Sequence, residues 1–368
     1  MPPRRHEQKQ IRVVVVDDSA FMRKAISMML ESDPAIKVVG TAANGEDAID
    51  VIRRLKPDLA TMDVEMPRMD GLTALRRLME TDPLPVMMVS SITTEGAAAT
   101  LDALDLGAVD FIPKQSSYVS LDIVKIRDDL LAKIKNIVAR KHVLMARLRE
   151  RKRFTRSAGI SPVVPPPAVS RPVSAGRKQH HVDIVAIGSS TGGPPALHTV
   201  LSQLPGNLPA GIVIAQHMPP MFTKTLAERL NTLSQLQVKE AVDGDPVEPG
   251  HVLISPGGKH LVVRRYGGRI RASVTADPPQ TLYKPCVDVL FDSAAETCGQ
   301  STLGVVLTGM GTNGVKGAQR IKSQGGVVIA QDEATCVVYG MPRAVVEARL
   351  ADHIVPLESI APEIASYF

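Results

Sequence analysis

The sequence predicts two consecutive α/β domains, the first with a five-stranded parallel sheet and the second doubly wound with an inserted antiparallel flap. The chain has 368 residues, 44% of them apolar, which is enough for two hydrophobic cores. Short β-branched runs alternate with amphipathic stretches in both halves, as in parallel sheets covered by helices. A Pro- and Ser-rich segment, SPVVPPPAVSRPVSAGRKQ, separates the halves and indicates an extended tether.

Five apolar runs mark the strands of the first domain. Because the carboxyl ends of parallel strands lie along one edge of a sheet, we expect ligands to bind there. A long helix is predicted after the last strand, from Leu121 to Arg153. The runs are IRVVVV from Ile11, IKVVGTA from Ile36, DLATM from Asp58, PVMMVS from Pro85 and AVDFI from Ala108.

A second alternation begins at Val182 and predicts the other domain. Helices are expected from Pro194, Phe222 and Met341, and β-rich stretches from Val238 to Val274 suggest the flap. The strands are VDIVAIG, GIVIAQ, LGVVLTG from Leu303 and GGVVIAQ from Gly325. The predicted boundaries are a disordered tail (1–10), the first domain (11–130), a basic helix end with a Pro-rich linker (131–181) and the second domain (182–368).

The net charge of +5 comes from one segment. Between Lys133 and Lys178 there are 13 Lys and Arg against the single acid Glu150, so the rest of the chain is mildly acidic. A DNA-binding regulator is the hypothesis that this segment suggests. Aromatic residues are only 3% of the chain and no helix-turn-helix candidate is evident, so we expect no nucleic-acid partner.

Cysteine usage and hydropathy narrow the class of protein further. The three cysteines include no CxxC pair, which argues against a disulfide framework or a zinc site. No apolar run reaches the roughly 18 residues of a membrane helix, and the basic N-terminus lacks an apolar signal core. These features predict a cytoplasmic protein.

Polar side chains end successive strands of the first predicted sheet. Asp17 and Asp18 follow the first strand, Asp63 the third, Ser90 the fourth and Lys114 the fifth. Three carboxylates at one edge would repel one another unless a hard cation such as Mg²⁺ lay between them. One carboxylate could then accept a phosphoryl group, with the ammonium and hydroxyl binding its oxygens. Helix caps and solvated acids are the alternative for any one residue alone.

The residues VVVVDDSAFMRK, MDVEMPRMDGL, VSS and FIPK resemble the receiver domains of two-component response regulators, which have a flavodoxin-like fold. One position departs from the family, because receivers usually have Pro where this chain has Gln115. The resemblance implies Asp63 as the phosphoacceptor, Asp17, Asp18 and Asp63 as Mg²⁺ ligands, Ser90 as the switch hydroxyl and Lys114 as the phosphoryl contact.

IGSSTGG places Ser190 at the centre of G-x-S-x-G, between a strand and a helix, where hydrolases carry their nucleophile. Gly188 and Gly192 permit the sharp turn that this motif needs. A nucleophilic serine also needs a base, and His217 directly follows the next strand, at the same predicted edge. A Gly-rich turn that binds phosphate and a structural histidine are the competing interpretations.

A dinucleotide-binding fingerprint is the strongest competing motif. Gly309, Gly311 and Gly314 spell G-x-G-x-x-G between a strand and a helix, and Asp332 ends the next strand. This pattern alone would indicate a dehydrogenase. Against it, the fingerprint normally opens its domain, whereas here about 120 residues of the domain precede it.

IGSSTGGP, AQHMPPMFT, HVLISPGGKH, LTGMGTNG and AQDEATCVVYGMPRAV together resemble the catalytic domain of the chemotaxis protein-glutamate methylesterases, the CheB family. The resemblance implies Ser190 as nucleophile, His217 as general base, the Met310 amide as oxyanion donor and Thr191 as support. It implies hydrolysis of glutamate methyl esters, and deamidation of glutamines, on the cytoplasmic helices of chemoreceptors. A chemotaxis histidine kinase would be the phosphodonor, the membrane would be met only through the receptor, and the esterase domain would need no cofactor.

Asn313 departs from the family, whose third catalytic residue is an Asp in the turn GMGxDG. An Asn can orient a histidine but gives no charge to stabilise the imidazolium, and in a serine protease Asp→Asn lowers turnover roughly 10⁴-fold. Three alternatives follow. The chain is a catalytically impaired binding protein controlled by phosphorylation, a nearby acid such as Asp332 substitutes, or Asn313 deamidates to Asp because Gly314 follows it.

Overall fold

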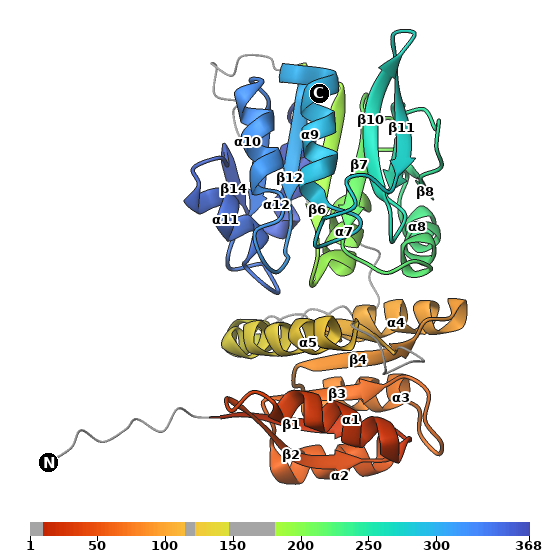
Figure 1. Cartoon of the computed structure of the whole chain (residues 1–368), viewed down its shortest axis with the longest axis vertical. Helices are drawn as coiled ribbons and strands as arrows, with labels where there is room; N and C mark the ends of the chain where they lie inside the picture. The colour runs from red at the N-terminus through yellow and green to blue at the C-terminus, as the bar shows by residue number, and fades with distance from the viewer. Residues whose placement is uncertain (1–9, 115–121, 147–180) are drawn as a thin grey trace, which may run out of the picture.

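The structure is a computed structural model of the chain, and it describes residues 10–114, 122–146 and 181–368. Figure 1 shows two domains stacked along the long axis of the molecule. Most of the predicted tail and linker, and Gln115, lie outside the described residues. Within the described ranges, no helix has both the length and the apolarity that crossing a bilayer requires.

The N-terminal domain is the predicted five-stranded parallel sheet, in the order β2-β1-β3-β4-β5. Val13 to Val16 are fully buried, because helices cover both faces of this sheet. Its elements are β1 (Ile11–Val16), α1 (Ala20–Glu31), β2 (Ile36–Ala42), α2 (Gly45–Leu55), β3 (Leu59–Asp63), α3 (Gly71–Thr81), β4 (Val86–Ser91), α4 (Thr94–Leu106), β5 (Asp110–Lys114) and α5 (Asp122–Ala139).

The predicted long helix after β5 is interrupted. α5 ends at Ala139, a turn follows at Arg140, and residues 141–146 are helical again. At this turn the Arg140 guanidinium reaches the C-terminal domain, where it binds a carboxylate oxygen of Glu333 at 2.9 Å and also the Glu333 carbonyl. The interruption of the helix at Arg140 therefore coincides with a contact to Glu333, which is distant in the sequence. The local periodicity of the sequence does not predict such a contact.

The C-terminal domain has a seven-stranded parallel sheet in the order β14-β13-β12-β6-β7-β9-β8, and β10 and β11 form the separate antiparallel flap. Its strands are β6 (Ile184–Ser189), β7 (Gly211–Gln216), β8 (Gln237–Glu240), β9 (His251–Ile254), β10 (His260–Tyr266), β11 (Arg269–Thr275), β12 (Thr302–Val306), β13 (Val327–Gln331) and β14 (His353–Val355). Its helices are α7 (Gly193–Leu201), α8 (Phe222–Leu233), α9 (Val287–Cys298), the short η1 (Gly299–Ser301), α10 (Val315–Ser323), α11 (Met341–Glu347) and α12 (Leu357–Ala365). β14 and α12 are two elements that the sequence pattern did not predict.

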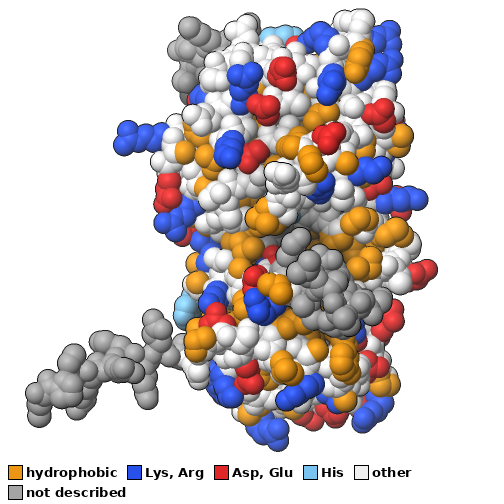
Figure 2. All heavy atoms as spheres, viewed as in Figure 1, with side chains coloured by type: hydrophobic (Ala, Val, Ile, Leu, Met, Phe, Trp, Pro, Cys, Tyr) orange, Lys and Arg blue, Asp and Glu red, His pale blue; other side chains and the backbone are white. Residues whose placement is uncertain are grey.

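The two domains meet through α4 and α5 of the first domain, which face the second in Figure 1, and through Phe111 of β5. The rings of Phe111 and Phe222 stack across the junction with their centroids 4.6 Å apart. Arg229 of α8 binds Asp102 at 2.6 Å and also Asp105, both on α4. Figure 2 shows Lys and Arg interspersed with Asp and Glu over the viewed face of both domains. That face therefore carries no extended basic surface of the kind that binds nucleic acid.

Candidate phosphoacceptor and esterase sites

The N-terminal site contains three carboxylates at the sheet edge. Asp17 and Asp63 are buried and Asp18 is exposed, and their ligand oxygens lie within 4.8 Å of one another. Asp17 Oδ2 is buried, and the contact it makes among the described residues is with the Lys114 ammonium. Oxygen donors in such a cluster suit a small divalent cation. The residues present therefore fit the predicted Mg²⁺.

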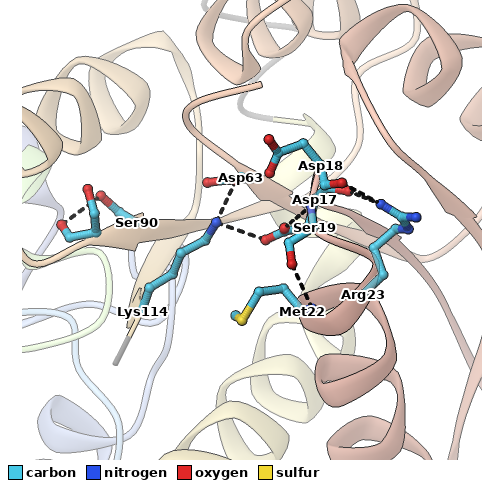
Figure 3. Close-up of polar contacts among 9 residues, drawn as sticks. Asp17, Asp18, Ser19, Met22, Arg23, Asp63, Ser90 and Lys114 are labelled. Atoms are coloured by element: carbon cyan, nitrogen blue, oxygen red, sulfur yellow. Dashed lines mark hydrogen bonds and ion pairs between the residues drawn. The ribbon is translucent and has the colours of Figure 1, made fainter. Parts of the chain in front are cut away.

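Lys114 lies between two of these carboxylates, as Figure 3 shows. Its Nζ atom is 2.5 Å from Asp63 Oδ2 and 2.9 Å from Asp17 Oδ2. Burial alone would lower the pKa of Lys114, but the bonds to Asp63 and Asp17 raise it. Burial raises the pKa of Asp63 to about 6, against the opposing effect of Lys114. Asp63 is thus a desolvated carboxyl next to a permanent cation.

Ser90 lies at the same edge but does not join this cluster. Its hydroxyl donates to the carbonyl of Gly96 on α4, at 3.0 Å. In Figure 3 it lies on the opposite side of Lys114 from Asp17. Four of the five predicted residues therefore come together, while the Ser90 side chain turns toward α4.

Ser190 lies on a tight turn at the carboxyl edge of the second sheet, between the end of β6 and the start of α7. Its amide donates to Thr308 O at 3.0 Å and its carbonyl accepts from Gly193 N at 2.7 Å. Gly192 has φ of +74°, and a Cβ there would lie 2.6 Å from Val337 Cβ. A glycine is required at this position, and the turn leaves Ser190 partly accessible.

His217 directly follows β7, the strand beside β6, and its amide donates to Ser189 O at 3.1 Å. The buried Gln216 joins the two segments, because its amide nitrogen donates to Ser190 O at 3.0 Å and to His217 O at 3.2 Å. The sequence analysis missed Gln216, although a polar residue ending a buried strand is a signal for such a role. The side chains of Ser190 and His217 form no hydrogen bond here, as is common in sites without substrate.

Asn313 fixes the tautomer of His217. Its Oδ1 atom lies 2.9 Å from His217 Nε2 and 2.7 Å from Val287 N, and its Nδ2 atom donates to Asp288 Oδ2 at 2.7 Å. A backbone N–H only donates and a carboxylate only accepts, so the amide has one possible orientation. Nε2 of His217 therefore carries the proton, and the buried Nδ1, which has no partner among the described residues, has the free lone pair.

Burial keeps His217 neutral. Its ring stacks on Tyr283 with centroids 4.3 Å apart and an angle of 15°. Burial lowers the pKa of His217 to about 4, the hydrogen bond that His217 donates to Asn313 partly opposes this, and the Lys133 ammonium of α5 lowers it further. A neutral imidazole is the form that a general base needs.

The predicted supporting residues lie beside Ser190. A Cβ at Gly309 would be 2.8 Å from Ser190 Cβ, so the loop that contains Met310 passes close to Ser190. No hydrogen bond in the described part of the chain uses the Met310 N–H. Thr191 Oγ1 is buried without a partner among the described residues. These groups can therefore bind a substrate atom.

The dinucleotide-binding interpretation is wrong, because an internal carboxylate occupies the N-terminus of α10. Asp288 Oδ1 accepts from Gly314 N and Gly317 N, each at 2.9 Å, where a pyrophosphate would bind. Asp332 binds Thr335 through that residue's amide at 2.9 Å and hydroxyl at 2.5 Å, and makes no hydrogen bond to His217 or Asn313. The acid beside Asn313 is Asp288, which the sequence analysis did not single out.

The chain is similar to known proteins over nearly its whole length. The family models described as response regulator receiver domain and CheB methylesterase match residues 13–123 and 185–364. A protein-glutamate methylesterase/protein-glutamine glutaminase of Oleidesulfovibrio alaskensis is 52% identical over 96% of this chain and 98% of its own. One of Nitratidesulfovibrio vulgaris is 54% identical with the same coverage. The CheB methylesterase catalytic domain of Thermotoga maritima is 46% identical, with a TM-score of 0.50, and the match covers 51% of this chain and 99% of that domain.

Proposed function

This chain belongs to the protein-glutamate methylesterase/protein-glutamine glutaminase (CheB) family of chemotaxis hydrolases, and we propose that Ser190 and His217 perform its hydrolysis under the control of Asp63. The observation that carries the assignment is the pairing of a Ser190 turn with an oriented, neutral His217 at one sheet edge. The substrates are methyl esters of glutamyl residues, and glutamines, on the cytoplasmic helices of chemoreceptors. The enzyme therefore works in the cytoplasm.

Acylation begins when Ser190 Oγ adds to the ester carbonyl. His217 Nδ1 accepts the hydroxyl proton, since Nε2 already holds its own proton against Asn313. The Met310 N–H donates to the oxygen that becomes negative, and the Thr191 hydroxyl lies beside it. When the intermediate collapses, the C–O bond to the methoxy group breaks, and the methoxy group leaves as methanol with the proton from His217.

Deacylation repeats the same proton transfers with water as the nucleophile. His217 Nδ1 takes a proton from water as its oxygen bonds to the acyl carbon, and then returns the proton to Ser190 Oγ. The products are a glutamate side chain and free Ser190. A glutamine follows the same route and releases ammonia. The reaction needs no cofactor in this domain.

Asp63 accepts the phosphoryl group from a chemotaxis histidine kinase. Its position 2.5 Å from Lys114 supports this assignment, because that ammonium can bind the phosphoryl oxygens. Asp17, Asp18 and Asp63 would hold Mg²⁺, which supplies charge neutralisation when bound. Ser90 would turn from Gly96 O to the phosphoryl group, and since Gly96 lies in the first turn of α4, that rotation alters the helix that binds Arg229.

The contact between the domains supports control by exposure of the site. Lys133 of α5 is near enough to lower the pKa of His217, and Met310 packs against a hydrophobic cluster that joins Val338 to buried residues of the first domain. These contacts support an arrangement in which the receiver covers the esterase site. Phosphorylation would shift the equilibrium toward separated domains, in which a receptor helix can enter.

Methanol release from methylated chemoreceptor fragments, with and without a small-molecule phosphodonor, tests this function. We expect release that rises with the phosphodonor, and none from Ser190→Ala. A full-length protein that binds the receptor in a phosphodonor-dependent way but releases no methanol would instead be the controlled binding protein. The relatives named above are enzymes by name, and Asn313 retains the hydrogen bond to His217, so we favour hydrolysis.

A further inference from the structure

Asp288 connects two parts of the esterase site through its two carboxylate oxygens. Oδ1 accepts from Gly314 N and Gly317 N and so caps α10 from the first turn of α9. Oδ2 accepts from Asn313 Nδ2 at 2.7 Å. The bonds to Oδ1 thus hold the carboxylate in place. The bond to Oδ2 orients the Asn313 amide, and that amide in turn orients the His217 ring.

We propose that Asp288 is a positioning residue for the esterase, which supplies through Asn313 the negative charge that the residue bound to His217 lacks. This inference rests on the proposed function of Ser190 and His217. The carboxylate polarises the Asn313 amide, so that Oδ1 becomes a stronger acceptor for the His217 Nε2 proton. The charge of the usual acid is thereby moved one side chain away from the histidine.

Other charged groups around His217 do not supply this charge. Lys133 is a cation, and the two acids nearest to it, Asp110 and Asp129, are paired with it at 3.0 and 3.4 Å. Burial raises the pKa of Tyr283, so the stacked phenol is neutral near pH 7. Among the described residues, Asp288 is thus the carboxylate that is hydrogen-bonded to the His217–Asn313 pair.

A purely structural cap is the competing explanation, and an exchange of the two side chains separates them. In Asp288→Asn, Oδ1 still accepts from Gly314 N and Gly317 N, but an NH₂ group then faces the NH₂ group of Asn313. Two donors cannot bond, so Asn313 loses the charged acceptor of its Nδ2 group and keeps the contacts with Val287 N and Cys286 Sγ. In the double variant Asp288→Asn/Asn313→Asp, every donor again meets an acceptor, and the carboxylate faces His217.

The experiment measures methanol release and the rate at which a fluorophosphonate probe labels Ser190, both on the full chain. We expect Asp288→Asn to lower kcat and the labelling rate at least about tenfold with little change in KM, because it disturbs the base and not substrate binding. The exchange variant should recover both rates to within about threefold of the unmodified chain. Asp292→Asn is the matched control, since it removes a charge from the same helix and its one ion pair is with Arg320.

A second comparison keeps the test decisive if Asp288→Asn folds poorly. In an Asn313→Ala background the link is cut, so Asp288→Asn should have no further effect on labelling. Unchanged labelling in Asp288→Asn, or an exchange variant that folds but stays slow, would overturn the proposal. Labelling that follows this pattern without methanol release would support Asp288 while refuting the proposed substrate. Methanol release that is the same in the unmodified chain and in Asp288→Asn would support the proposed substrate and refute the role of Asp288.

Discussion

The two sheet edges of this chain carry charge in opposite ways. At the receiver edge, three carboxylates lie together, and Lys114 pairs with two of them, Asp17 and Asp63. At the esterase edge, the one carboxylate of Asp288 is bound by two backbone amides and the Asn313 side chain. The first edge has an excess of negative charge that favours binding of an external cation. At the second edge, groups of the protein itself provide the hydrogen bonds to the carboxylate.

This difference matches two kinds of chemistry on similar parallel sheets. A phosphoacceptor must accept and release a highly charged phosphoryl group. Its site therefore needs a bound cation to balance the negative charge of the carboxylates and the phosphoryl oxygens. An esterase must stabilise a short-lived charge, so its dipoles need to be fixed before substrate arrives. The hydrogen bonds of Gln216, Asn313 and Asp288 provide that fixed arrangement around His217.

Removing the nucleophile or the base should give the largest effect on the esterase edge. Ser190→Ala and His217→Ala are each expected to lower methanol release by roughly 10³-fold or more, because each removes the proton-transfer unit. The double variant should be no slower than either single variant. A double variant slower by the product of the two losses would show that the residues act independently.

Asp63→Asn should have the largest effect on the receiver edge. Without the carboxylate, labelling by a small phosphodonor is expected to disappear, while basal methanol release stays, since Asp63 lies outside the esterase site. Asp50 is an exposed acid of α2 outside the carboxylate cluster, so Asp50→Asn serves as a matched control that retains the acceptor and the predicted Mg²⁺ ligands. Undiminished labelling of Asp63→Asn would move the phosphoacceptor to another residue.

The pH response of His217 reports whether the receiver covers the esterase edge. In the packed molecule its pKa is lowered to about 4, chiefly by burial, so the ring stays neutral down to that pH. Separation of the domains removes part of this burial and the nearby Lys133 cation, so the pKa should rise toward about 6.5. NMR titration of labelled histidine, before and after phosphodonor treatment, measures the shift. An unchanged midpoint would mean that the domains do not separate.

The ion pairs across the junction should have a smaller effect. Arg229→Ala removes the bonds to Asp102 and Asp105, and because these side chains are partly exposed, we expect basal methanol release to rise only about two- to fivefold. Arg343→Ala is the control, since its ion pair with Glu347 lies within one helix. Equal basal rates for both variants would show that the α4 to α8 contact does not restrain the enzyme.

The sequence predicts the parts of both sites that depend on strand order. β-branched runs locate the strand ends, and parallel strands then bring Asp17, Asp63 and Lys114 to one edge, as observed. It does not predict contacts made between elements. Asp288 reaches Asn313 only because α9 packs beside α10, and the turn at Arg140 accompanies a bond to Glu333 in the other domain. No local periodicity or residue spacing in the sequence predicts either contact.

The smallest effect on turnover is expected for the substitution Asn313→Asp. Asn313→Asp would place a carboxylate 2.7 Å from Asp288 Oδ2, where the amide now donates. The new carboxylate would face His217 directly, but it would repel Asp288 and lose the hydrogen bond that now orients the side chain, so the two effects oppose each other. Turnover should therefore change by less than about threefold, in contrast to the roughly 10⁴-fold loss that Asp→Asn causes in a serine protease.

Spontaneous conversion of Asn313 to Asp must be excluded before that comparison is made. Gly314 N, which would attack the amide, instead donates to Asp288 at 2.9 Å, and the amide itself is held by His217, Val287 and Asp288. We therefore expect intact-mass measurements on fresh and aged protein to show no gain of about 1 Da. A rise of tenfold or more for a verified Asn313→Asp variant would show that Asp288 does not supply the charge. Equal turnover of the Asn313 and Asn313→Asp forms would mean that the esterase site already has the charge it needs with Asn313 in place.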